Sequence, residues 1–317
     1  LSAAVNVNTA SLVTTSTGGN LTLTGVVSGS NGIISMQRAG SALTLRGVNT
    51  YMGATVAQPI TVDTSNFIVS TGQIVFDQGG TALNSSRFDM IGGTKLLLNN
   101  FSLVNGIPRI GSTASVNLNN GILEVIGGTD ATPTASLTQN AGMLTGTGHN
   151  AVAATSAPGG EGVTLSFASL SRGPNGTGTF TFTGSSANFG TAPAGSDQQR
   201  ILFGLAPPLV GVAPTTPIVP FAIGGITSAS AGSGLLTYDA NGLRLLNETT
   251  EYSVDAFATD ANIRLTTSLT NNAAVTINSL FINGAALLDG TGTLTITSGT
   301  VLTTNAPTIA NNLHFGA

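Results

Sequence analysis

The sequence lacks cysteine and tryptophan, and charged residues make up only 7% of its 317 residues. Without cysteine the chain can form neither a disulfide framework nor a cysteine-based zinc site. Ordinary soluble domains contain about 25% charged residues, so solubility must come here from Thr, Ser and Asn. The single lysine, Lys95, and the few arginines cannot form the basic stripe that nucleic acids require. We therefore expect no nucleic-acid partner.

Long hydrophobic runs are also absent. No apolar run approaches the roughly 18 to 20 residues that a membrane-spanning helix needs. A transmembrane β-barrel would have alternating strands too, but its rims carry aromatic girdles, and aromatic residues make up only 5% of this sequence. We expect no membrane span in this segment.

Short alternating runs separated by glycine, asparagine and serine fill the segment 19–56. In the runs 21–24 and 43–46, apolar residues occupy every second position, which is the period of a strand with one buried face. Leucine should then point inward and threonine outward. Glycine, at 42 residues, supplies the turns. Because no helix follows that could cover the apolar face, each unit must be covered by the next one, as in a solenoid.

The same segment carries a family resemblance. The residues concerned are Gly40-Ser41-Ala42-Leu43-Thr44-Leu45, followed by Gly47-Val48-Asn49-Thr50-Tyr51 and Gly53. This run resembles the autotransporter-associated β-strand repeat of bacterial surface proteins, and the segment 284–302 is a partial second copy. The resemblance covers about one eighth of the chain. It implies an exported, right-handed parallel β-helix that in most relatives is not an enzyme.

Three regions of the chain differ in hydrophobic pattern and proline content. Residues 1–150 contain alternating runs at roughly ten-residue spacing and are predicted to form a β-solenoid. The region 151–262 holds eight of the twelve prolines. Because proline cannot donate to a β-ladder, we predict an irregular insertion of β-hairpins and loops, or a small β subdomain. Residues 263–317 resume the alternation and are predicted to continue the solenoid. The fold class is therefore all-β.

Neither end of the segment has the sequence of a polar or helical cap. Uncapped solenoid ends expose backbone groups that template further strands. The segment is therefore expected to be either a piece of a longer chain or a subunit that stacks end to end. We favour end-to-end self-association into a filament, with Val5, Val7, Leu313 and Phe315 in the terminal turns as candidate contact residues. The sequence starts at Leu1 without the features of a signal peptide, so we expect any such peptide to have been removed or to lie outside this segment. Low charge and the absence of cysteine favour an extracellular or bacterial cell-surface location.

The densest acidic cluster lies within residues 239–260. Its members Asp239, Glu248, Glu251 and Asp255 are weak candidates for calcium ligands, and paired carboxylates could also act as acid and base on a carbohydrate. A solvated surface is the simpler interpretation. The two histidines, His149 and His314, have no metal-binding spacing, and no nucleophile elbow or phosphate-binding loop occurs. We expect no cofactor and no catalytic residue.

Two functional hypotheses follow from these observations. The first is a non-enzymatic structural protein that forms a surface fibre, sheath or adhesive filament, with surface glycans as possible partners. The second is a carbohydrate-binding or carbohydrate-active β-helix that uses the acidic segment 239–260. A passenger domain joined to an outer-membrane barrel outside this segment is a third possibility.

Overall fold

The structure is a computed structural model of the chain. It describes residues 3–9, 11–15, 19–59, 72–130, 136–157, 159–187, 189–190, 197–227 and 232–316. The described residues form β-strands and loops, with no α-helix and one short 3-10 turn at Pro174–Gly176. None of their helices could cross a membrane. The chain divides into two compact units, Leu1–Ala206 and Pro207–Ala317. The all-β prediction is confirmed.

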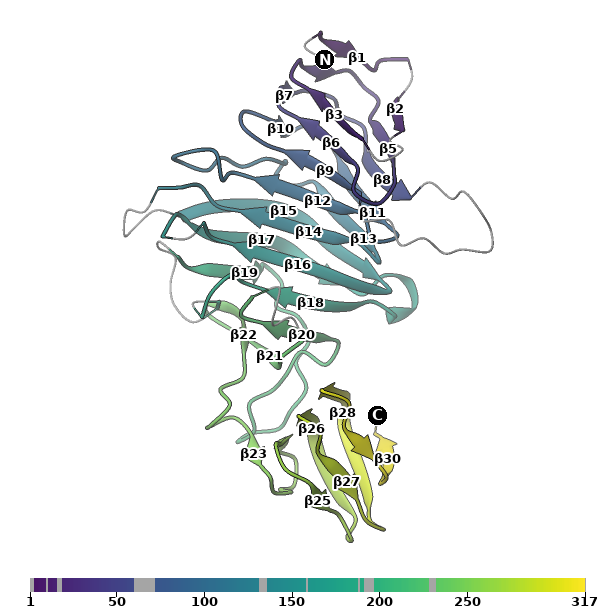
Figure 1. Ribbon diagram of the computed structural model, residues 1–317, viewed down its shortest axis with the longest axis vertical. Helices are drawn as coiled ribbons and strands as arrows, with labels where there is room; N and C mark the ends of the chain where they lie inside the picture. The colour runs from purple at the N-terminus through teal and green to yellow at the C-terminus, as the bar shows by residue number, and fades with distance from the viewer. Residues whose placement is uncertain are drawn as a thin grey trace. The chain divides into compact units, whose positions relative to one another are not determined.

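Unit 1 (Leu1–Ala206) is a parallel β-helix, the fold that the sequence predicted for residues 1–150. Each turn of the chain, here called a rung, contributes one strand to each of two long parallel sheets (Figure 1). The first sheet contains β2 (Leu12–Thr15), β5 (Ile33–Gln37), β8 (Thr55–Pro59), β11 (Arg87–Ile91), β13 (Ser115–Asn119), β15 (Ser136–Thr147), β17 (Gly162–Ser171) and β19 (Gln199–Phe203). The second sheet of this unit contains β3 (Asn20–Leu23), β6 (Ala42–Leu45), β9 (Gln73–Phe76), β12 (Lys95–Asn99), β14 (Ile122–Ile126), β16 (His149–Thr155) and β18 (Thr179–Thr183).

A narrow third face is made of two-residue strands in the early rungs. These strands are β1 (Val5–Asn6), β4 (Val27–Ser28), β7 (Val48–Asn49) and β10 (Thr81–Ala82). β1 pairs in parallel with β4, and β7 with β10.

The core of unit 1 consists of rows of apolar side chains that stack in register from rung to rung. One such row in the second sheet contains Leu23, Leu45, Phe76, Leu98, Val125 and Ala154. Every member is at most 4% exposed. Along β12 the side chains alternate between buried and partly exposed, which is the two-residue period that the sequence predicted. Each rung therefore buries the apolar face of its neighbours.

The residues that carry the family resemblance form strands β6 and β7 and the turns beside them. Asn49 is buried, and its side-chain oxygen accepts a hydrogen bond from the amide of Val27 at 2.8 Å. Its side-chain nitrogen donates to the carbonyls of Gly47 and Thr81 at 2.8 and 2.9 Å. The Asn49 side chain thus forms hydrogen bonds with backbone groups on three rungs. A buried polar side chain needs such hydrogen bonds to offset the cost of its desolvation.

Tyr51 and Gly47 lie in the turns beside β7. The Tyr51 ring is fully buried, and its hydroxyl lies 2.6 Å from the hydroxyl of Thr55. Burial raises the pKa of Tyr51 well above its ordinary value. A Cβ atom on Gly47 would lie 2.4 Å from the carbonyl oxygen of Gly25, so only glycine allows the two rungs to approach this closely.

Rungs differ in length although their strands stay in register. Val5 pairs with Val27, 22 residues further on, whereas Leu165 pairs with Ile201, 36 residues further on. Part of the difference lies in the strands themselves, since β17 has ten residues and β5 has five. The sequence pattern predicted that the solenoid ends at residue 150. In the structure β16 crosses that position, and parallel pairing continues to Phe203 in β19. The dense proline run begins only at Pro207, and proline is what a parallel ladder cannot accommodate.

Unit 2 (Pro207–Ala317) begins with an antiparallel arrangement. β20 (Ala222–Gly225) pairs with β21 (Gly234–Asp239), and β21 pairs with β22 (Gly242–Leu245). The hairpin between β21 and β22 turns at Ala240 and Asn241. These strands lie within the region for which the sequence predicted hairpins and loops.

The rest of unit 2 is again parallel. One sheet contains, in spatial order, β23 (Ser253–Val254), β24 (Asn262–Leu265), β26 (Val275–Asn283), β28 (Thr293–Thr304) and β30 (Asn312–Phe315). A second sheet contains β25 (Leu269–Thr270), β27 (Leu287–Asp289) and β29 (Thr308–Ile309). Ile263, Leu280 and Ile296 are among the fully buried residues between them. The predicted return of the solenoid pattern in 263–317 corresponds to these strands.

Candidate functional sites

Two of the acidic candidates, Asp239 and Glu251, meet around one arginine. The Nε of Arg244, on β22, donates to Asp239 at 2.7 Å, and its two terminal nitrogens donate to Glu251 at 2.7 and 2.9 Å. These hydrogen bonds raise the pKa of Arg244 above its ordinary value. The hairpin β21–β22 brings Asp239 and Arg244 together because they lie close on its two strands. The centre of this cluster is therefore a guanidinium group.

Glu251 accepts two further hydrogen bonds. They come from the backbone amide of Asn247 at 2.6 Å and from the hydroxyl of Thr216 at 3.0 Å. The bonds from Arg244, with these two, lower the pKa of Glu251 to about 2. Glu251 lines a small hollow of about 160 Å³ with Thr216 and Asn262. A carboxylate that accepts four hydrogen bonds and has so low a pKa is a poor proton acceptor at neutral pH.

The other two acidic candidates have separate partners. Glu248 pairs with Arg264 at 2.9 Å. Asp255 accepts hydrogen bonds from the hydroxyl and amide of Thr266 at 2.6 and 2.7 Å and from the amide of Thr267 at 3.0 Å. Desolvation raises the pKa of Asp255, but these hydrogen bonds outweigh it and the pKa is lowered. Within the described ranges, no three acidic or histidine side chains gather closely enough to hold a metal ion.

The four candidate contact residues of the terminal rungs differ in exposure. Val7 is 2% exposed and lies in the core, and Val5 is half-buried on β1. Leu313 is half-buried against the core of unit 2. Phe315 is 55% exposed, although Ile296, its neighbour in register, is fully buried. Of the four, only Phe315 presents a large exposed apolar side chain.

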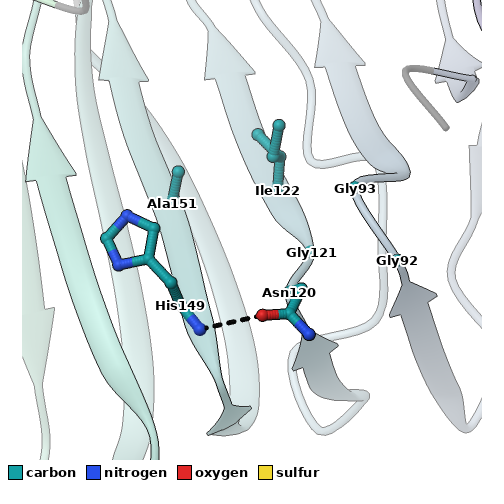
Figure 2. Close-up of a pocket in the computed structure, with 7 residues that line it drawn as sticks. All are labelled: Gly92, Gly93, Asn120, Gly121, Ile122, His149 and Ala151. Carbon is teal, nitrogen blue, oxygen red and sulfur yellow. Dashed lines mark hydrogen bonds between the residues drawn. The ribbon is translucent and has the colours of Figure 1, made fainter. Parts of the chain in front are cut away.

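A larger hollow, of about 400 Å³, lies over the corner between the two sheets of unit 1 (Figure 2). Gly92, Gly93, Asn120, Gly121, Ile122, His149 and Ala151 line it. They come from three successive rungs, where β11 turns into β12, β13 into β14, and β15 into β16. Figure 2 shows the side chains of Ile122 and Ala151 standing on neighbouring strands, with the His149 ring beside Ala151.

The polar groups of this hollow are held in place by cross-rung hydrogen bonds. The amide of His149 donates to the side-chain oxygen of Asn120 at 3.1 Å. The two ring nitrogens of His149 lie 3.3 Å from the hydroxyls of Thr179 and Thr181 on the next rung. A Cβ atom on Gly148, which has a φ of 69°, would lie 2.3 Å from the Asn120 side chain. Glycine at this position therefore lets Asn120 reach the His149 amide.

The sequence alone does not indicate this hollow. His149 has no metal-binding spacing, and no motif singles out Asn120 or Gly121. The rungs that form the hollow have different lengths, so the alignment of Gly92, Gly121 and His149 depends on the strand register. Strand register between rungs is not readable from local periodicity. The second histidine, His314, lies exposed on β30 and away from these residues in the chain.

Comparison with protein-family models, curated proteins and solved structures gives no match for this chain.

Proposed function

We propose that this chain is a non-enzymatic structural protein of the bacterial cell surface, in which β-solenoid units stack into a fibre, sheath or adhesive filament. The observation that carries the proposal is the in-register stacking of buried rows through successive rungs of unit 1. Such a column transmits load through continuous backbone ladders, and its geometry allows one more rung to be added wherever an edge strand is open. The resemblance of the segment 40–53 to an autotransporter repeat supports the surface location.

Edge strands at the first and last rungs support self-association. β2 and β3 each pair on one side only, and so does β30, as far as the described strands go. In the row Ile277, Ile296 and Phe315, the first two are fully buried while Phe315 is 55% exposed. A rung from a second copy would cover Phe315 and continue the parallel ladder. A head-to-tail contact that does not close into a ring generates filaments.

The arrangement of carboxylates supports a non-enzymatic role. A glycoside hydrolase of the usual kind needs one carboxylic acid and one carboxylate free to exchange protons. Here Asp239 and Glu251 share the guanidinium of Arg244. The acidic segment thus acts as a brace between β21, β22 and the loop that contains Glu251.

Negative-stain electron microscopy and sedimentation of the 317-residue chain test the proposal. We expect rods that lengthen with protein concentration. Phe315→Asp should place a charge in the stacking contact and leave single short particles. Phe101→Asp is the matched control, because Phe101 is 54% exposed but lies in the loop after β12. Monodisperse particles of the unaltered chain at every concentration, or equal effects of the two substitutions, would refute stacking.

A further inference from the structure

The hollow of Figure 2 has the size and the lining of a small-molecule site. Its volume of about 400 Å³ falls within the range of about 300 to 1,000 Å³ for such sites, which combine an apolar lining with a few converging polar groups. Ile122 and Ala151 supply the apolar floor, and both are half-buried. Asn120 and His149 supply polar groups at the exposed rim.

The backbone amides of the lining are already used. Those of Gly92 and Gly93 donate to the carbonyls of Asn119 and Asn120 at 2.8 and 2.6 Å. The amides of the other lining residues also have acceptors. Three of them donate to backbone carbonyls: Asn120 to Thr147, Ile122 to Thr94, and Ala151 to Gly121. The other two donate to side-chain oxygens: Gly121 to Asn150, and His149 to Asn120. A peptide strand, which binds through backbone hydrogen bonds, finds no free amide donor in this lining. Polar recognition must therefore come from side chains.

The Asn120 side chain can provide it. Its amide nitrogen has one 3.3 Å contact, to Asn119. A contact of this length is weak, so a ligand hydroxyl can compete for it, and an amide offers both donor and acceptor capacity to hydroxyl groups. The two ring nitrogens of His149 face the hydroxyls of Thr179 and Thr181 on the next rung, so the ring borders the hollow beside Ala151.

The charge around the hollow selects against ions. No charged side chain lines it. Lys95, which is in register with Ile122, has its ammonium 3.0 Å from the carboxylate of Glu124. An anionic ligand would need an unpaired cation, and a metal ion would need more ligands than one imidazole.

We propose that this hollow binds a neutral pyranose sugar. The apolar C–H face of the sugar ring lies on Ile122 and Ala151 beside the His149 ring, and its hydroxyls bond to the Asn120 amide. A sugar has one apolar face and a hydroxyl periphery, so it matches a floor and a rim of these kinds. The site is separate from the acidic segment 239–260 and does not depend on filament formation.

The test compares two alanines on one strand. Ala151 and Ala153 are both half-buried, two residues apart on β16, and only Ala151 lines the hollow. Ala151→Leu should fill the floor, while Ala153→Leu adds the same volume outside it. Binding of the methyl glycosides of glucose, galactose, mannose and N-acetylglucosamine is measured by saturation-transfer NMR and calorimetry, with glucuronate as the charged comparison. Thermal unfolding checks that both variants fold.

We expect saturable binding of at least one neutral glycoside, with a Kd of about 1 mM or tighter, and none of glucuronate. Ala151→Leu should weaken that binding at least tenfold, and Ala153→Leu less than twofold. His149→Ala should weaken it while the protein stays folded. Absence of binding to all four glycosides, or unchanged binding in Ala151→Leu, would overturn the proposal. Neither result bears on filament formation, which is measured without sugar.

Discussion

The guanidinium of Arg109 donates to the backbone carbonyl of Gly80 at 2.7 Å, and Arg109 is fully buried. The same nitrogen donates to Gln78 at 2.6 Å, and the other terminal nitrogen donates to Asn99 at 2.6 Å. Burial lowers the pKa of Arg109 to about 10, so it stays charged at neutral pH. One cation therefore ties together the backbones of neighbouring rungs.

Replacing Arg109 by methionine should lower the free energy of unfolding of unit 1 by about 3 kcal/mol or more. The reason is that three backbone carbonyls, of which only that of Gly80 belongs to a buried residue, would lose a charged donor, and a hydrogen bond to a charged group contributes about 1.5 to 3 kcal/mol. Urea unfolding followed by hydrogen exchange in peptides of unit 1 measures the change. Arg38→Met, at an exposed position, serves as the control and should change stability by less than about 0.5 kcal/mol. Equal effects of the two changes would contradict the role given to Arg109.

Glu251 should make unit 2 sensitive to acid. Its pKa is lowered from 4.5 to about 2 in the folded protein, so its stabilising contribution is complete above pH 4.5 and is lost as the pH falls from there towards 2. Glu251→Gln should cost about 2 kcal/mol at pH 7 and flatten the stability profile over that window. Urea unfolding of unit 2 at pH 7, 4 and 3 provides the measurement.

Glu248→Gln is the matched control for Glu251. The side chain of Glu248 is 59% exposed in its pair with Arg264, and exposed ion pairs contribute about 0 to 1 kcal/mol. An acid profile that is the same in Glu251→Gln and in the unaltered protein would show that other groups cause the pH dependence.

Two neighbouring leucines on β12 should respond very differently to truncation. Leu98 is fully buried in the stacked row, so Leu98→Ala should destabilise unit 1 by about 2 to 5 kcal/mol. Leu97 is half-buried on the outer side of the same strand, and Leu97→Ala should cost less than about 1.5 kcal/mol. Thermal or urea unfolding distinguishes them. Similar losses for both would mean that the alternation along β12 is not the one described.

Much of the fold could be predicted because it depends on local periodicity. The alternation at Leu43 and Leu45 and the turns at Gly47 and Gly53 indicated a solenoid, and the structure has parallel ladders there. The limits of the solenoid could not be predicted. Strands such as Thr179–Thr183 look alike in sequence whether they pair in a local hairpin or with His149–Ala153, a rung away. That choice depends on non-local packing.

The candidate sites were harder to predict than the fold. The acidic residues near 239–260 were found by their density in the sequence, but Arg244 placed between Asp239 and Glu251 changes what they can do. Arg244 and Asp239 lie on a hairpin and Glu251 lies in the loop after it, so their meeting is visible only once the pairing of β21 with β22 is known. The hollow at Asn120 and His149 required the register of three rungs of unequal length. The first fact depends on how one short stretch folds back on itself, and the second depends on contacts between stretches far apart in the sequence.

The unequal rung lengths have an evolutionary consequence. Extra residues at a corner leave the rows above and below unchanged, whereas one extra residue inside a strand would reverse the facing of every side chain after it. Selection can therefore lengthen, shorten or decorate the corners one at a time, while the stacked interior stays the same. The 22-residue spacing of Val5 and Val27 and the 36-residue spacing of Leu165 and Ile201 show how much variation a single column tolerates. Diversification of the protein's surface should thus concentrate at its corners.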